Sequence, residues 1–139
     1  TTVRRNTYDN IMESGIFTLN PVFEKHIADA HHTSAKYPIE ISEFDKTNFE
    51  EEYKDDCYAP FVKGAPLQIR MKFLEEVHIK ANGTLLVLAE VEKIYVREEM
   101  ISNDYFIDLS KGKIATVTGL DGYAVPNSIE RYSYQRPKK

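Results

Sequence analysis

The alternation of apolar and polar residues over residues 67–79 constrains the fold of this chain more than any other feature of its sequence. Successive side chains of a strand point to opposite faces, so this pattern predicts a long strand with one buried face. Asn82-Gly83 follows it and is typical of a two-residue hairpin turn, because both residues tolerate a positive φ. The apolar run from Leu85 to Val96 predicts the returning strand. The alternating apolar positions are Leu67, Ile69, Met71, Phe73, Val77 and Ile79.

The register of this hairpin predicts an irregularity in its first strand. A two-residue turn at Asn82-Gly83 pairs Ile79 with Leu86 and Val77 with Leu88, and it then sets Glu75 opposite Glu90. Like charges that face each other across a ladder are unfavourable, so we expect a β-bulge near Leu74–Glu76. Strongly bent hairpins of this kind belong to barrels.

Two short helices are expected before the hairpin. Residues 6–14 have apolar positions at helical spacing, and Gly15 stands where a left-handed residue ends a helix. A short strand is predicted over residues 16–19. Asn20 is expected to cap a second helix that begins at Pro21 and runs to about His31.

Residues 33–66 have the composition of a long loop, with three prolines and scattered aromatic residues. We expect Tyr53, Tyr58 and Phe61 to anchor it, and a short helix to start at Ser42 or Thr47. Further strands are predicted over residues 105–109 and 114–118. The predicted fold class is therefore α+β, with helices first and then an antiparallel meander that curls into a barrel.

Composition narrows the class of protein. The chain has 139 residues, a net charge of −4 and one cysteine, which indicates one globular domain that is not built on disulfides and suits a reducing compartment such as the cytoplasm. The acidic balance disfavours a general nucleic-acid binder. No apolar run approaches a membrane span, and no signal peptide is visible. Thr1 is not methionine, and we expect that the beginning of the chain has been removed.

Few residues suggest acid, base or metal chemistry. Cys57 follows Asp55-Asp56, whose charges disfavour a thiolate, so a partly buried structural cysteine is expected there. The four histidines lack the spacing of a metal site, and neither a phosphate-binding loop motif nor a nucleophile elbow is present. Asn82-Gly83-Thr84 matches a glycosylation acceptor, but the hairpin turn already accounts for it. We therefore predict neither a catalytic side chain nor a metal site.

The segment Thr2–Thr7 is the one place where the residues themselves suggest a ligand. It precedes or opens the first predicted helix, whose free backbone N–H groups and dipole favour an anion. Arg4, Arg5 and the threonine hydroxyls add donors, and a phosphate suits them. A capped helix with two solvated arginines remains the alternative at this point.

Several motifs resemble those of the flavin reductase-like, FMN-binding split-barrel family. The stretch from Thr7 to Asn20 resembles the family pattern T-x-x-N-I-x-E-S/T-G-x-F-x-x-N. His32-Thr33-Ser34-Ala35-Lys36 followed by Ser42-Glu43-Phe44 resembles its T-S-A … S-E-F segment. Ala59-Pro60-Phe61-Val62, the long hairpin and Gly119-Leu120-Asp121-Gly122-Tyr123 fit too, so the resemblance covers nearly the whole chain.

The resemblance implies a single domain over residues 1–139: a mainly antiparallel split β-barrel with two short N-terminal helices. It also implies a homodimer that holds FMN near the subunit interface and transfers hydride from NAD(P)H through the flavin. Thr7, Arg4 and Arg5 become phosphate ligands, with Thr2 as a further candidate. Asn20 is expected to be structural.

Four more residues are candidates for the cofactor site through the same resemblance. His32, Thr33 and Ser34 are expected either in the wall of the flavin or nicotinamide pocket or as ordinary helix-end residues. Tyr123 either stacks near the flavin or across the dimer, or packs in the core.

One departure from the family pattern leaves the function open. Family members carry several strands before the first helix, including the loop that lines the flavin ring, and this sequence does not contain them. An FMN-dependent oxidoreductase is the first hypothesis, and a non-catalytic FMN-binding or degenerate split-barrel dimer is the alternative. A small barrel that binds oligonucleotides through exposed aromatics is a weaker third, against which the negative charge argues.

Overall fold

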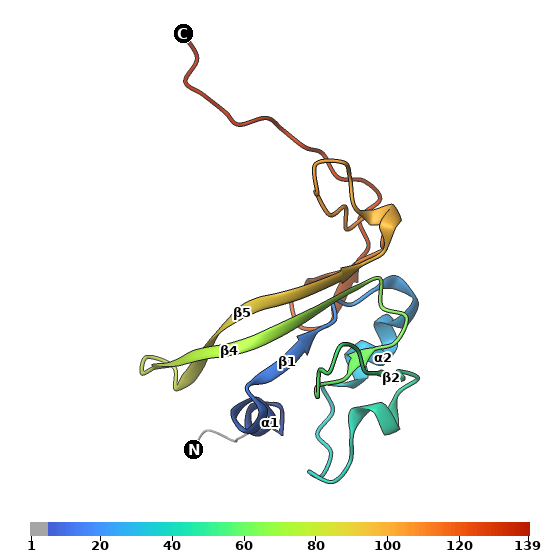
Figure 1. Cartoon of the computed structure of the whole chain (residues 1–139), viewed down its shortest axis with the longest axis vertical. Coiled ribbons are helices and arrows are strands. Elements are labelled where there is room, and N and C mark those ends of the chain that lie inside the picture. The colour runs from blue at the N-terminus through green and yellow to red at the C-terminus, as the bar shows by residue number, and fades with distance from the viewer. Residues whose placement is uncertain (1–5) are drawn as a thin grey trace.

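The computed structural model describes residues 6–139, and its dominant feature is a long curved hairpin. Strands β4 (Leu67–Ile79) and β5 (Thr84–Val96) pair antiparallel, and β1 (Ile16–Leu19) pairs with the other edge of β4. This three-stranded sheet has the order β1-β4-β5 (Figure 1). The two strands of the hairpin predicted from alternation are therefore confirmed, but the predicted buried face is wrong at Val77 and Ile79, which are 43% and 39% exposed.

The turn of this hairpin differs from the prediction. Ile79 faces Thr84 and Val77 faces Leu86, so four residues, Lys80 to Gly83, connect the strands. The predicted pairs of Ile79 with Leu86 and of Val77 with Leu88 are wrong. Of Asn82 and Gly83 only the glycine takes a positive φ (+67°), whereas a two-residue type I′ turn needs it at both positions. Gly83 instead donates its N–H to the Ile79 carbonyl at 3.0 Å.

The predicted bulge is confirmed. The register shifts between Phe73 and Glu75, which leaves Leu74 without a partner on β5. The shift places the positive Lys72 opposite the negative Glu90, and Glu75 faces Leu88 instead. The repulsion between Glu75 and Glu90 is thereby avoided. A second shift, between Arg70 and Met71, was not predicted. The residue that it leaves unpaired, Glu92, forms an ion pair with Arg70 (Nε–Oε2 2.9 Å).

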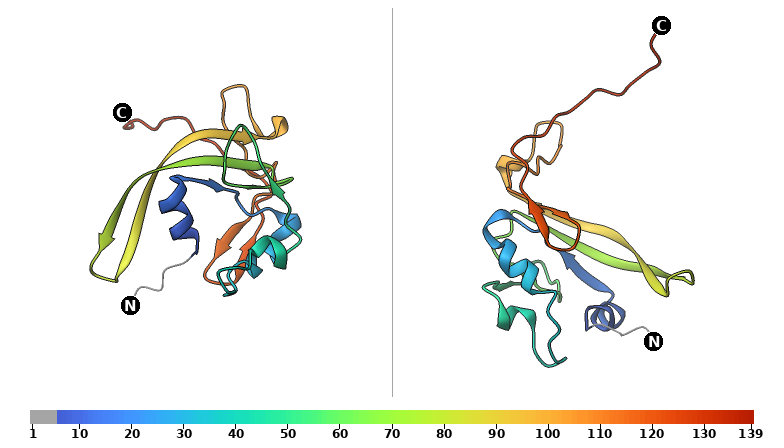
Figure 2. Two further views of the ribbon diagram at one scale, coloured as in Figure 1. Left: turned by 60° about the horizontal axis from the view of Figure 1, so that its bottom comes forward. Right: turned by 180° about the vertical axis from the view of Figure 1, so that it is seen from behind.

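Helix α1 (Asn6–Ser14) has the predicted bounds and lies on the concave side of the hairpin (Figure 2). Gly15 ends it in the left-handed conformation (φ +69°) and donates its N–H to Ile11 O at 2.8 Å, as predicted. Ile11 is buried, and the Tyr8 hydroxyl donates to Glu76 Oε2 at 2.7 Å. The Tyr8 hydrogen bond thus joins the helix to β4.

The second helix begins later than predicted. A 3₁₀ turn, η1 (Glu24–His26), leads into α2 (Ile27–His32), so Asn20 is not its cap. Residues 22–24 instead run extended beside residues 113–115, with Ala115 N–H donating to Val22 O at 2.7 Å and Glu24 N–H donating to Lys113 O at 2.9 Å. Pairing across this long separation outweighs the local preference of Asn-Pro for a helix start.

The connection over residues 33–66 contains a 3₁₀ helix, η2 (Glu43–Lys46), and two short paired strands, β2 (Glu51–Glu52) and β3 (Phe61–Val62). Ser42 caps η2 as one of the two predicted start points, accepting a hydrogen bond from Phe44 N–H at 3.2 Å. Of the three predicted anchors only Phe61 is buried; Tyr53 and Tyr58 are 59% and 87% exposed, so they do not anchor this segment.

The last part of the chain is less regular than predicted. Residues 105–109 form a single bridge, Ile101 with Ile107, instead of a strand, because Tyr105 takes a left-handed φ of +64°. The 3₁₀ helix η3 (Glu98–Met100) follows β5, and β6 (Thr116–Thr118) pairs with β7 (Gly122–Ala124). Residues 127–139 are exposed, and the chain end extends away from the body (Figure 1).

The largest buried cluster lies where these segments meet, at the base of the hairpin. Phe23, Leu67, Met100 and Ile114 form it, with Ile69, Val96 and Ile107 packed around them. The fold is thus mixed α and β with mostly antiparallel sheets, as predicted in outline. None of the helices within residues 6–139 is long and apolar enough to cross a membrane.

Candidate functional site

A pocket of about 550 Å³ lies between α1, β1 and the loop before β3, and we call it the α1 pocket. Thr7, Asn10 and Ser14 line it from α1 at positions i, i+3 and i+7, which places them on one face of the helix. The remaining wall is formed by Ile11, Glu13, Ile16, Phe17, Thr18, Tyr58, Ala59 and Pro60.

Hydrogen bonds fix the two sides of this pocket relative to each other. The Thr18 hydroxyl donates to Pro60 O at 2.7 Å and accepts from Asn20 Nδ2 at 3.0 Å. Asn20 Oδ1 in turn accepts from the Val62 N–H at 3.0 Å. The predicted structural role of Asn20 thus takes a form other than a helix cap. Its amide ties the end of β1 to β3, beside the loop that closes the pocket.

The polar groups of the pocket differ in what they can offer a ligand. Ser14 Oγ lies 2.9 Å from both Asn10 O and Ile16 O, so its hydroxyl serves the end of the helix. Thr7 stands in the first turn of α1, where the helix dipole is positive. The Thr7 end of the pocket therefore suits an anion, and the exposed Asn10 side chain adds a polar group one turn further on.

Three predicted phosphate ligands, Thr2, Arg4 and Arg5, lie outside the described residues. Thr7 is the one predicted phosphate ligand that the structure places, and it lines the α1 pocket.

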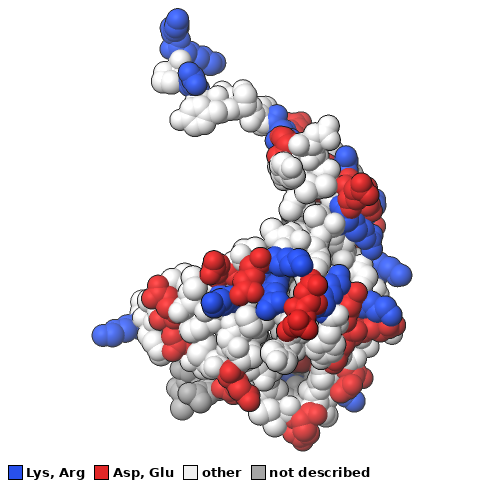
Figure 3. Space-filling view, in the orientation of Figure 1, with Lys and Arg blue, Asp and Glu red and all other residues white. Residues whose placement is uncertain are grey.

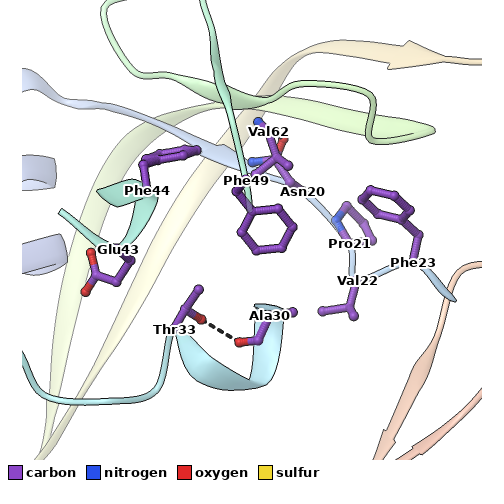
Figure 4. A pocket seen from close by; sticks show the side chains of 10 residues that line it. All are labelled: Asn20, Pro21, Val22, Phe23, Ala30, Thr33, Glu43, Phe44, Phe49 and Val62. Atoms are coloured by element: carbon purple, nitrogen blue, oxygen red, sulfur yellow. Dashed lines mark hydrogen bonds between the residues drawn. The ribbon is translucent and has the colours of Figure 1, made fainter. Parts of the chain in front are cut away.

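Thr33 lies in a second, smaller pocket of about 240 Å³, the α2 pocket (Figure 4). Its hydroxyl donates to Ala30 O at 2.6 Å, which is the helix-end arrangement expected as its alternative. Phe44 and Phe49 line the opposite wall in Figure 4, and Asn20 and Phe23 complete one side.

The loop that carries Phe49 is held by Asp29 of α2. Asp29 Oδ1 accepts hydrogen bonds from Asn48 N–H at 3.0 Å and from Asn48 Nδ2 at 3.2 Å. The backbone N–H of Asn48 and then His26 Nδ1 hold the pKa of Asp29 below its usual value of 3.8. An ionised carboxylate therefore fixes the wall of the α2 pocket at neutral pH.

His32, Ser34 and Tyr123 line neither of these two pockets. His32 Nε2 lies 2.6 Å from the Tyr37 hydroxyl, and Ser34 Oγ donates to His31 O at 2.8 Å. The Tyr123 hydroxyl lies 2.9 Å from His31 Nδ1, so it joins β7 to the end of α2. The predicted residues that the structure describes thus lie in three places: Thr7 in the α1 pocket, Thr33 in the α2 pocket, and His32, Ser34 and Tyr123 around the end of α2.

Sequence reasoning missed several residues of the α1 pocket. Asn10 stands in the motif T-x-x-N, and its spacing from Thr7 already places both residues on one helix face. Thr18, Tyr58 and Pro60 carry no such signal, because only the fold brings β1 beside the loop before β3. Within residues 6–139 no group of three or more His, Cys, Asp or Glu side chains could hold a metal ion.

Comparison with known proteins decides the family. The sequence model of the flavin reductase like domain matches residues 2–111 of this chain. The chain belongs to the flavin reductase-like family. No curated protein sequence matches it.

Several solved structures share the fold. A split-barrel protein from Shewanella frigidimarina NCIMB 400, assigned as a flavin reductase, is 37% identical, with a TM-score of 0.91 over 94% of this chain and 66% of its own. Component B of nitrilotriacetate monooxygenase from Bacillus cereus is 19% identical (TM-score 0.80), over 94% of this chain and 65% of its own. Flavoredoxin of Desulfovibrio vulgaris (Miyazaki F) is 17% identical (TM-score 0.75), over 97% of this chain and 70% of its own. The chain thus spans about two thirds of the length of these structures.

Proposed function

We propose that this chain binds FMN in the α1 pocket and acts as a flavin-dependent oxidoreductase that takes hydride from NAD(P)H. The observation that carries the proposal is the coincidence of two independent features. The family motif supplies Thr7 and Asn10, and the fold places these two residues on one wall of a pocket at the start of a helix.

The residues of the α1 pocket fit the polar end of FMN. The Thr7 hydroxyl would donate to the phosphate, and the positive end of the α1 dipole would favour its charge. Thr2, Arg4 and Arg5 remain predicted phosphate ligands from the sequence. The Asn10 amide would bind the hydroxyl groups of the FMN chain next to the phosphate. Tyr58 and Pro60 would form an apolar wall.

A flavin-dependent reaction does not require a catalytic side chain, and the sequence predicts none. Bound flavin supplies a ring that accepts hydride from a reduced nicotinamide. The protein supplies position, charge and exclusion of water. The proposed wall residues for the flavin ring or the nicotinamide remain those at the end of α2 and on β7: His32, Thr33, Ser34 and Tyr123.

The complete site is proposed to form in a homodimer of closed split barrels. Residues 1–139 would form one domain of that barrel. Large apolar side chains stay more than one third exposed on the distal half of the hairpin, which favours a covering partner: Leu74, Val77, Ile79, Leu86 and Leu88. The single buried cysteine fits a reducing compartment such as the cytoplasm.

Absorbance of the purified chain tests the proposal. After FMN is added and free flavin is removed by desalting, we expect a resolved flavin band, together with NADH or NADPH oxidation above that of free FMN. A band without accelerated oxidation would replace the enzyme by the non-catalytic FMN-binding module. Loss of the band on desalting, in a chain whose mass confirms Thr1 at its start, would contradict flavin binding by these residues.

A further inference from the structure

A third pocket, of about 480 Å³, adjoins the α2 pocket, since Phe23 and Phe49 line both. We call it the basic pocket. Its four cationic side chains come from four separate segments: Lys25 from η1, Lys63 from the turn after β3, Arg97 from the end of β5, and Lys113 from the loop before β6. The fold therefore gathers cations that are far apart in the sequence.

The charge of this pocket is opposite to that of the chain. Four cations and two carboxylates, Glu24 and Glu50, line it, whereas the whole chain carries a net charge of −4. Lys63 pairs with Glu50 at 3.2 Å. Among residues 6–139, no carboxylate lies within ion-pair distance of Lys25, Arg97 or Lys113, although the Arg97 guanidinium donates to Gly64 O at 2.8 Å. Unpaired cations around a hollow attract an anion.

The backbone fixes the position of Lys113. Lys113 takes a left-handed φ of +55°, its carbonyl accepts from Glu24 N–H at 2.9 Å, and its N–H donates to Ser110 O at 3.1 Å. The preceding Gly112 packs against Met100, a fully buried side chain. The loop is thus held by the core, which fixes the position of Lys113. The proposed flavin site makes no use of this loop.

Aromatic rings line the same pocket. The His26 ring lies between Phe23 and Phe49, with ring centroids 5.1 and 5.3 Å away, and the latter two rings make part of the shared wall. Phe23 belongs to the buried cluster, so the half-buried Phe49 is the ring available for stacking. A ring beside cations suits a ligand that has both a flat base and phosphate groups, because bases stack on rings and phosphates bind Lys and Arg.

We infer that the basic pocket binds a nucleotide that carries two or more phosphate charges. The pocket shares no lining residue with the α1 pocket, so this inference does not depend on flavin binding there. The same chemistry is found in the reductant NADPH and in an adenine nucleotide that is not a substrate.

Calorimetric titration of the flavin-free chain at low salt tests the inference, with ADP and adenosine as probes. We expect saturable ADP binding, adenosine binding at least about ten-fold weaker, and about ten-fold weaker ADP binding for Lys25→Gln and for Lys113→Gln, since each removes a charge-assisted contact. Lys111→Gln and Lys80→Gln are matched controls, because both lysines lie outside the pocket lining. Absence of saturable ADP binding, or equal weakening in the controls, overturns the inference.

Two further arms separate the sources and the role of the rings. Tighter binding of NADPH than of ADP assigns the pocket to the reductant, and tighter binding of ADP assigns it to a separate nucleotide. Phe49→Leu is expected to weaken ADP binding and to leave inorganic pyrophosphate binding unchanged. Equal loss of both ligands in this variant would contradict the aromatic part of the site.

Discussion

Gln68 shows how one buried polar residue joins two parts of the fold. It is 2% exposed, and its Nε2 donates to Val62 O at 2.6 Å and to Glu52 Oε2 at 3.1 Å. Its Oε1 accepts from Lys54 Nζ at 2.7 Å. The residue thereby connects β4 to β2, β3 and the loop between them.

We predict that Gln68→Met lowers the free energy of unfolding by about 1–3 kcal/mol, because it leaves buried hydrogen-bonding groups without a partner. Urea denaturation measures the change. Gln135→Met, in the exposed tail, is the matched control and is expected to change stability by less than about 0.5 kcal/mol. Equal stability of Gln68→Met and the parent chain would contradict this role.

Gly112 makes a second prediction at this scale. A Cβ at this position would lie 2.4 Å from Met100 Cε and 2.5 Å from Met100 Sδ, and Met100 is fully buried. We therefore expect Gly112→Ala to destabilise the chain by about 1–3 kcal/mol through overpacking. In a double-variant cycle, Met100→Ala makes room for the new methyl group. The stability loss of the double variant, measured by thermal unfolding, is therefore expected to be smaller than the sum of the two single losses. Full additivity would show that the methyl group meets something else.

Single residues were predicted correctly where their role is local. Gly15 was found because a helix end needs a left-handed residue, and Ser42 because a cap acts within its own turn. The anchor predicted at Tyr58 is wrong because this side chain is 87% exposed. The cap predicted for Asn20 is wrong because its side chain bonds the Val62 N–H, 42 positions away. Local preference cannot report such partners.

At the scale of elements, the bulge at Leu74 sets which charges face each other. It places Lys72 opposite Glu90, whereas Glu75 faces Leu88. We predict that Glu90→Lys destabilises the hairpin by up to about 1 kcal/mol, and that the double exchange Lys72→Glu with Glu90→Lys recovers most of the loss. Chemical denaturation of the parent chain, the single variants Lys72→Glu and Glu90→Lys, and the double variant measures the coupling. Glu75→Lys is the control and is expected to give no coupling with Glu90→Lys.

Alternation predicted β4 and β5 as strands, but the predicted buried face applies only to the part of β4 before the bulge at Leu74. The bulge turns Val77 and Ile79 to the opposite face, where they are exposed. The predicted register is wrong by two residues: Ile79 pairs with Thr84 and not with Leu86, because four residues and not Asn-Gly alone form the turn. For the site, helical spacing could have placed Asn10 beside Thr7. The opposite wall, around Pro60, follows from long-range closure that no periodicity records.

At the scale of the whole molecule, ionised aspartates tie distant segments together. Hydrogen bonds from Lys93 and then from Tyr95 hold the pKa of Asp55 below its usual value of 3.8, and Arg131 does the same for Asp104. Arg131 also stacks over the Phe106 ring, 4.1 Å from its centroid, which fastens the start of the tail. These contacts join the loop before β3 to β5, and the tail to the loop after η3.

These lowered pKa values predict the sign of the pH dependence. A carboxylate with a folded-state pKa below the unfolded one stabilises the fold above about pH 4, and this contribution is lost as the pH falls further, through the folded-state pKa. Stability is therefore expected to decline below about pH 4, and to decline less steeply in Asp55→Asn and Asp104→Asn. Urea midpoints between pH 5 and pH 2 measure the slopes, with the exposed Asp121→Asn as the control. Identical slopes in all four chains would contradict the assignment.

The most direct test of flavin binding in the α1 pocket compares FMN with riboflavin, which differs only by the phosphate. Fluorescence titration gives both dissociation constants for the parent chain and for Thr7→Val, with Thr118→Val on β6 as the control. We predict that Thr7→Val weakens FMN binding about ten-fold and leaves riboflavin binding unchanged, since only the phosphate meets the Thr7 hydroxyl. Equal effects on the two flavins, or none on either, would contradict a phosphate site at the start of α1.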